Sequence, residues 1–132
     1  MIKRLEVQTS ARIQLIDITA QVKSFLRSEG VSSGIIVIYV PHTTCGITIN
    51  ENADPSVKED INALLKKLVP HDGVYRHAEG NSDAHIKASM VGSSVTVIVE
   101  SGAPILGTWQ GIFLADFDGP RKRSVLLKFI PG

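Results

Sequence analysis

Short stretches in which apolar and polar residues alternate recur along the chain, and this period of two is typical of β-strands. The run at residues 34–40, GIIVIYV, is instead continuously apolar, which predicts a strand buried on both faces. Residues 13–18 alternate only weakly. In total the pattern predicts six or seven strands, at residues 2–9, 13–18, 34–40, 46–50, 94–100, 111–117 and 124–130.

Three further segments have the spacing or the end signals of helices, at residues 20–29, about 55–68 and 83–91. The expected capping residues are Thr19, Asp54 followed by Pro55, Asn81 or Ser82, and, at the C-terminal ends, Gly30 and Gly92. Because the helices follow no regular βαβ order, the sequence predicts an α+β fold. We expect a single compact domain over residues 1–132, with a mostly antiparallel sheet or sandwich and three helices.

The overall charge argues against one broad class of function. Lys and Arg number 14 and Asp and Glu 13, which gives a net charge of +1 and no basic excess of the kind nucleic-acid-binding proteins show. No apolar run approaches the roughly 18 residues of a membrane-spanning helix, and the charged start does not resemble a signal peptide. The single cysteine, Cys45, excludes an intrachain disulfide. We therefore expect a cytoplasmic protein that binds neither nucleic acid nor membrane.

The reactive polar side chains are concentrated in four segments, residues 41–54, 75–85, 107–111 and 116–123. Each segment lies at the end of a predicted strand or helix, where loops on a rigid scaffold usually carry function.

Three histidines, His42, His77 and His85, lie near Asp83 in these segments. Together they have the donor types of a zinc site with an open position, or of general acids and bases. Their spacing matches no standard metal motif, so spacing alone favours a site without metal. The alternative is that one or two of them are surface or capping residues. We assign no role to His71.

Features that suit a phosphate group occur in the same segments. The helix start at Asn81-Ser82-Asp83 leaves backbone N–H groups free for an anion, and Gly80 allows close approach. Hydroxyls from Thr43 and Thr44 and the guanidinium of Arg121 would add to it. Ordinary helix capping explains the helix start equally well.

Carboxylates and two single residues complete the set of candidates. Asp116 and Asp118 would share a strand face with Gln110 and could hold Mg²⁺ with a phosphate, or could form a solvated strand end and turn. Cys45 would be a nucleophile if a histidine lowered its pKa, although a buried filler is the simpler role. Trp109 would stack on a planar ring, pack at a subunit interface or belong to the core.

Taken together, these segments resemble the YjbQ-like family, whose members are often labelled secondary thiamine-phosphate synthase enzymes. The resemblance covers almost the whole chain. It rests on His42-Thr43-Thr44, Asn50-Glu51-Asn52, the run GNSDAHIKAS at residues 80–89, GTWQG at residues 107–111 and DFDGPR at residues 116–121. One small variation is Asp116, after Ala115, where many relatives have Glu.

The resemblance implies a compact α+β domain, commonly assembled as a trimer, with a site between subunits that gathers His42, His77, His85 and the Asp-Gly-Pro-Arg turn. It also implies that a hydroxymethylpyrimidine diphosphate and a thiazole phosphate are joined to thiamine phosphate, with loss of pyrophosphate. The alternative is a metal- or anion-binding module without turnover.

The residues assigned to these roles fall into three sets. The catalytic candidates are His42, His77, Asp83, His85 and Arg121. The substrate-binding candidates are Thr43, Thr44, Asn50, Glu51, Asn81, Ser82, Trp109, Gln110, Asp116 and Asp118. The candidate ligands of a divalent metal, zinc or magnesium, are His42, His77 and His85.

Overall fold

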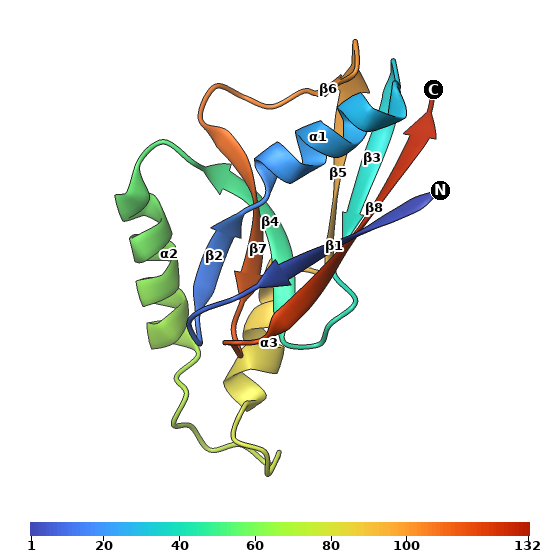
Figure 1. Ribbon diagram of the computed structural model, residues 1–132. Helices are drawn as coiled ribbons and strands as arrows, with labels where there is room; N and C mark the ends of the chain where they lie inside the picture. The colour runs from blue at the N-terminus through green and yellow to red at the C-terminus, as the bar shows by residue number, and fades with distance from the viewer.

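The computed structural model describes all 132 residues and contains eight strands and three helices (Figure 1). The strands are β1 (Ile2–Gln8), β2 (Gln14–Asp17), β3 (Gly34–Tyr39), β4 (Cys45–Glu51), β5 (Ser94–Glu100), β6 (Ala103–Pro104), β7 (Gln110–Asp116) and β8 (Lys122–Pro131). The helices are α1 (Thr19–Glu29), α2 (Pro55–Leu68) and α3 (Ser82–Val91). The predicted α+β class and the three helices are confirmed.

The strands form two antiparallel sheets, one of five strands in the order β1-β8-β3-β5-β6 and one of three in the order β2-β7-β4. The prediction of six or seven strands missed β6, which pairs Ala103 with Glu100 and Pro104 with Val99. A strand of two residues is too short to show alternation, so the sequence carries no signal for it.

The main hydrophobic core lies between the inner faces of the two sheets. Ile36 and Ile38 of β3 and Ile112 and Leu114 of β7 are completely buried there. Helix α1 closes one end of this core with the apolar stripe that the sequence predicted, Val22, Phe25 and Leu26 (Figure 1). The core therefore holds the two sheets in a fixed relation and fixes where their loops emerge.

Helices α2 and α3 lie on the outer face of the three-stranded sheet. Ala84 and Ala88 of α3 pack with Ala115 and Phe117 in a second, smaller cluster, and Leu65 of α2 contacts the same cluster. No residue of α2 is fully buried, whereas α3 contributes four buried residues. Helix α3 is therefore firmly docked, and α2 lies at the periphery. None of the three helices has the length and apolar character needed to cross a membrane.

The outer face of the five-stranded sheet is covered by no helix. Along β3 the side chains of Ile36 and Ile38 are buried, but Ile35 and Val37 are only half-buried and Tyr39 is 42% exposed. The prediction that residues 34–40 are buried on both faces is thus wrong within one chain, because only the inner face has a partner.

The helix ends follow the sequence signals in part. Asp54 caps α2 by accepting a hydrogen bond from the Ser56 N–H at 3.0 Å, and Gly30 ends α1 in the left-handed conformation, as predicted. Thr19 is not the cap of α1 but its first residue. The Asp17 carboxylate accepts from the Thr19 N–H at 2.9 Å, and the Thr19 hydroxyl accepts from the Ile112 N–H.

Candidate functional site

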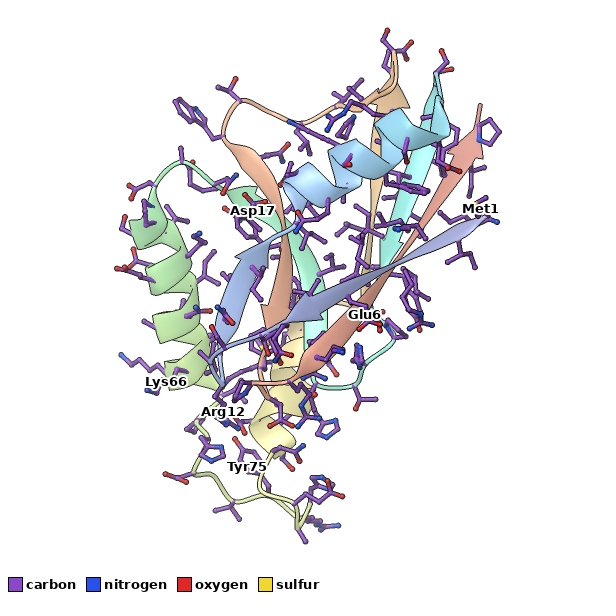
Figure 2. The ribbon with its side chains drawn as sticks, viewed as in Figure 1. Met1, Glu6, Arg12, Asp17, Lys66 and Tyr75 are labelled. Atoms are coloured by element: carbon purple, nitrogen blue, oxygen red, sulfur yellow. The ribbon has the colours of Figure 1, made fainter.

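The candidate residues lie at two opposite ends of the three-stranded sheet. Strands β4 and β7 pair from Cys45 opposite Asp116 to Glu51 opposite Gln110, six residue steps or about 20 Å apart. In Figure 2, Arg12 marks the first end and Asp17 the second. We call the first the histidine end; it holds His42–Thr44, His77, Asn81–Asp83, His85, Asp116, Asp118 and Arg121. We call the second the tryptophan end; it holds Asn50, Glu51, Trp109 and Gln110.

A hollow of about 510 Å³ lies at the histidine end, between the loop that leads into β4 and helix α3. His42 and His85, more than 40 residues apart in sequence, both line it. The other lining residues are Thr43, Cys45, Ala88, Ser89, Gly92 and Ser93, so no carboxylate lines the hollow. A space surrounded by donors and lacking carboxylates suits an anion.

His42 is held in a single protonation pattern. Its Nε2 accepts a hydrogen bond from the Ser124 backbone N–H at 2.9 Å, and because a backbone N–H can only donate, Nε2 is unprotonated. Burial, and then the positive charges of Arg123, Arg121 and Arg4, lower the pKa of His42, against an opposing effect of Asp116. At neutral pH the ring is therefore a neutral hydrogen-bond donor through Nδ1–H.

His77 contacts His85, and their rings meet edge to face with centroids 5.4 Å apart. His77 also lies 3.8 Å from the Glu79 carboxylate, so it belongs to the loop outside the hollow. No group of three or more His, Cys, Asp or Glu side chains is placed to hold a metal ion. The metal set of His42, His77 and His85, expected to bind zinc or magnesium, is therefore not assembled within one chain.

Asp83 is a buried anchor. Its carboxylate accepts two hydrogen bonds from Arg12, at 3.1 and 3.3 Å, and one from Lys87 at 3.0 Å, and it lies 3.1 Å from Nδ1 of His71. Burial would raise the pKa of Asp83, but the hydrogen bonds from Arg12, His71 and Lys87 outweigh it and hold the pKa well below its usual range. With its oxygens occupied, Asp83 fixes the start of α3, and this geometry does not favour the catalytic role expected for it.

A second buried ion pair lies beneath the hollow. Arg123 donates to Asp116 at 2.7 Å and to the Thr44 hydroxyl at 2.8 Å, and all three residues are buried. Burial acts against ionisation of Asp116, but the hydrogen bonds from Arg123, the Asp118 backbone and Thr9 together outweigh it and lower the pKa of the carboxyl. The neighbouring Cys45 is also buried, and burial raises its pKa to about 11. A thiol with that pKa is inert at neutral pH, which fits the role of a filler and not of a nucleophile.

The turn at Asp118–Arg121 forms the rim of the histidine end. Arg121 donates to the Asp118 carbonyl at 2.9 Å and to its carboxylate at 3.2 Å, and Asn81 donates to the same carboxylate at 2.9 Å. Asn81 thus stands at the N-cap position of α3 without capping it. Half of the Arg121 side chain, 51%, stays exposed and available to a ligand. Gln110, expected on the same face as Asp116 and Asp118, lies at the other end of β7.

At the tryptophan end a smaller hollow of about 240 Å³ is lined by Ile49, Asn50, Glu51, Trp109 and Gln110. The structure therefore separates these candidate residues from the histidines.

Comparison with known proteins assigns the chain to one protein family. The family model described as "UPF0047 protein YjbQ-like" matches residues 3–132. The chain belongs to the YjbQ-like UPF0047 family. A UPF0047 protein of Methanocaldococcus jannaschii is 55% identical over 130 residues, which are 98% of this chain and 94% of that protein. YugU of Bacillus subtilis is 51% identical, over 98% of this chain and 99% of that protein.

Solved structures agree with the assignment to the YjbQ-like family. A YjbQ/UPF0047 protein from Clostridium acetobutylicum, described as uncharacterized, superimposes with a TM-score of 0.95 at 54% identity, over 97% of this chain and 99% of that one. A YjbQ-like protein of unknown function from Sulfolobus solfataricus also gives 0.95, at 31% identity, over 100% of this chain and 97% of that one. The family resemblance and the fold class expected from the sequence are confirmed.

Several residues of this YjbQ-like site carry no signal in the sequence. Ser89 and Ser93 line the hollow, but serine is ordinary at such positions. Arg123 and Lys87 are buried ion-pair partners, although strand and helix periodicity would have placed charged residues outside. A charged residue at an inward position of a strand is the one clue that marks Arg123, since Val125 and Leu127 on the same face belong to the core.

Proposed function

We propose that this YjbQ-like protein is an enzyme that binds a phosphorylated small molecule in the hollow between His42 and His85. The observation that carries the proposal is the composition of that hollow: two histidines and three hydroxyl side chains line it, and no carboxylate does. Arg4, Arg121 and Arg123 act electrostatically on His42 from the same region, against the opposing charge of Asp116. A site of hydrogen-bond donors in a positive field stabilises bound phosphate and the charge that develops on a leaving pyrophosphate.

The named candidate reaction is the synthesis of thiamine phosphate, which the family resemblance suggests. The thiazole nitrogen forms a bond to the methylene carbon of the pyrimidine, and the bond from that carbon to the diphosphate oxygen breaks, so that pyrophosphate leaves with the electron pair. We assign to His42 Nδ1–H and Arg121 the stabilisation of the leaving group, and to Thr43 and Ser89 the orientation of the phosphate. His85 is the histidine left free to donate a proton to an oxygen of the departing pyrophosphate.

The test is turnover of hydroxymethylpyrimidine diphosphate and thiazole phosphate with added Mg²⁺, with thiamine phosphate as the measured product. We expect His85→Ala and Arg121→Ala to lower kcat/KM by about 100-fold, the usual loss for a proton-transfer or oxyanion group. Arg27→Ala is the matched control, because Arg27 is an exposed arginine on α1, away from the hollow. Full activity of both site variants would refute the assignment of the site.

A second candidate function is anion binding without turnover. One observation favours it: Nε2 of His42, the nitrogen a general base would use, is already occupied by the Ser124 N–H. This candidate predicts saturable binding of pyrophosphate by calorimetry, weakened in Arg121→Ala, with no product formed from the two precursors.

We also propose that the protein assembles as a homotrimer in the cytoplasm. The outer face of the five-stranded sheet supports self-association, because it carries apolar side chains that no element of the chain covers: Ile2, Ile35, Val37, Tyr39, Ile98, Leu126 and Ile130. A second copy is the occupant that would bury the continuously apolar β3 on both faces. The single buried thiol of Cys45 is compatible with a reducing compartment.

A further inference from the structure

We propose a second binding site, independent of the hollow at the histidine end, that takes a planar organic cation such as an N-alkylated nitrogen heterocycle. It lies at the tryptophan end, about 20 Å from the histidines along β4. Trp109 provides the aromatic surface and Glu51 the negative charge, and both line the hollow of about 240 Å³.

The first support is that Trp109 is exposed on a turn whose backbone is held by hydrogen bonds. Trp109 is 63% exposed. Such exposure is unusual, because tryptophan has a large apolar side chain and leaving it in water is unfavourable. The turn that presents it is closed twice: Gln110 N–H donates to the Gly107 carbonyl at 3.0 Å, and Gly107 N–H donates to the Gln110 side chain at 2.8 Å. The Trp109 carbonyl accepts from the Asn52 N–H at 2.7 Å. A turn fixed in this way presents the Trp109 side chain to a ligand without the cost of ordering a loop.

The second support is the state of the Glu51 carboxylate. Glu51 is half-buried and directly opposite Gln110 in the register, so both side chains lie on the inner face of the sheet. One of its oxygens accepts from the Ala53 N–H at 3.0 Å, and no lysine, arginine or histidine pairs with it. A half-buried carboxylate without a positive partner gains more from a bound cation than a solvated one does.

The charges around this hollow select the sign of the ligand. Two further carboxylates lie at this end of the sheet. The pKa of Asp17, on the opposite face from Glu51, is below its usual range, because burial is outweighed by the hydrogen bonds from Thr19 and Asn52 together with the charge of Lys58. Hydrogen bonds from Ser56 lower the pKa of Asp54, which caps α2 three residues after Glu51. The nearby cation, Lys58, is placed over the Phe113 ring at 5.3 Å and also acts on Asp17. Carboxylates therefore outnumber cations at this end, the opposite of the histidine end, and a phosphate would be repelled.

Size and surface select the shape of the ligand. A cavity of about 150 Å³ is enough for a benzene ring, so the hollow of about 240 Å³ has room for one substituted six-membered ring. A planar cation stacks on the indole face by a cation–π interaction while its charge faces Glu51. The amides of Asn50 and Gln110 provide hydrogen-bond partners at the ring edge.

The experiment uses the indole N–H signal in an NMR titration, because Trp109 is the single tryptophan and reports on this site alone. The probes are 1-methylnicotinamide, a planar cation, and nicotinamide, its neutral counterpart. We expect a saturable shift of the indole signal with the cation and at least fivefold weaker binding of the neutral compound. Glu51→Gln, which keeps the acceptor for the Ala53 N–H, is expected to weaken binding of the cation at least fivefold.

Glu29→Gln is the matched control, because it removes the same charge from an exposed position at the C-terminal end of α1 and should leave the titration unchanged. The proposal is overturned if the indole signal does not move with the cation, if both probes bind equally, or if the two Glu→Gln variants behave alike. The titration requires no turnover at the histidine end, so its result is separate from that of the activity assay.

Discussion

At the scale of single residues, the candidate site depends on charged side chains that are buried and fully paired. Asp83 and Lys87 are both completely buried, and Arg12 and His71 complete the cluster from the neighbouring loops. Removing one partner of such a cluster leaves an uncompensated charge in the interior, which costs far more than losing a surface ion pair.

This cluster predicts a large effect of Asp83→Asn. At neutral pH we expect the free energy of unfolding to fall by about 3–5 kcal/mol, because Lys87 loses its partner while buried. Urea denaturation followed by circular dichroism measures it. Asp72→Asn, an exposed change in the loop between α2 and α3, should cost little, and equal losses in the two variants would contradict the anchoring role.

The same residue predicts how stability depends on pH. The pKa of Asp83 lies well below its usual range in the folded chain and near 3.9 in the unfolded one, so below about pH 5 the unfolded state binds more protons. The stabilisation is present above the unfolded pKa and is lost as the pH falls towards the folded pKa. Unfolding curves between pH 6 and pH 2.5 should show a steeper loss for the native chain than for Asp83→Asn, and parallel curves would contradict this.

At the scale of elements, the position of His85 depends on how closely α3 approaches β4. A Cβ at Gly46 would lie 2.6 Å from the Gly92 carbonyl and 3.0 Å from the Val91 side chain, both at the end of α3. The Ile47 N–H donates to the same Gly92 carbonyl at 3.0 Å. The width of the hollow between His42 and His85 therefore depends on the close approach of Gly92, which lines the hollow, to Gly46, which does not.

We expect Gly46→Ala to lower the free energy of unfolding by about 1–3 kcal/mol, the usual cost of overpacking, and to weaken pyrophosphate binding by displacing α3. Thermal unfolding and calorimetry measure the two effects. Gly107→Ala is the control, because a Cβ there meets only the flexible Gln110 side chain at 3.4 Å. Equal behaviour of the two variants would show that α3 can move without cost.

The sequence alone predicted the helices and strands better than the contacts between them. The two capping signals at Asp54 and Gly30 are local, and both were confirmed because they depend only on neighbouring residues. Thr19 was misassigned, since Asp17 competes for the same backbone N–H. The wide separation of Trp109 from His42 follows from the register of β4 and β7, which no local pattern encodes. Likewise, nothing in the sequence shows that Asp83 would be saturated by His71 and Arg12.

At the scale of the whole molecule, the outer face of the five-stranded sheet is left uncovered in a single chain. The inner face of the five-stranded sheet packs into the core, but on the outer face Ile98 is 60% exposed and Ile130 42% exposed. Contiguous apolar patches of this kind mark interaction surfaces in folded proteins. If the trimer forms through this face, a charged substitution on it disrupts the assembly far more than the same substitution at an equally exposed position elsewhere.

This contrast gives a test of the assembly. In an isolated chain Ile98→Lys would change stability by no more than about 0.5 kcal/mol, as is usual for exposed positions. In a trimer built on this face it would bury an unpaired charge at every interface and dissociate the assembly. Leu68→Lys is the control, because Leu68 is 60% exposed, as Ile98 is, but lies at the end of α2, on the other sheet. Size-exclusion chromatography with light scattering should give the mass of three chains for the native protein and for Leu68→Lys, and of one chain for Ile98→Lys. A monomeric native protein would refute the trimer, and a trimeric Ile98→Lys variant would place its interface on another face.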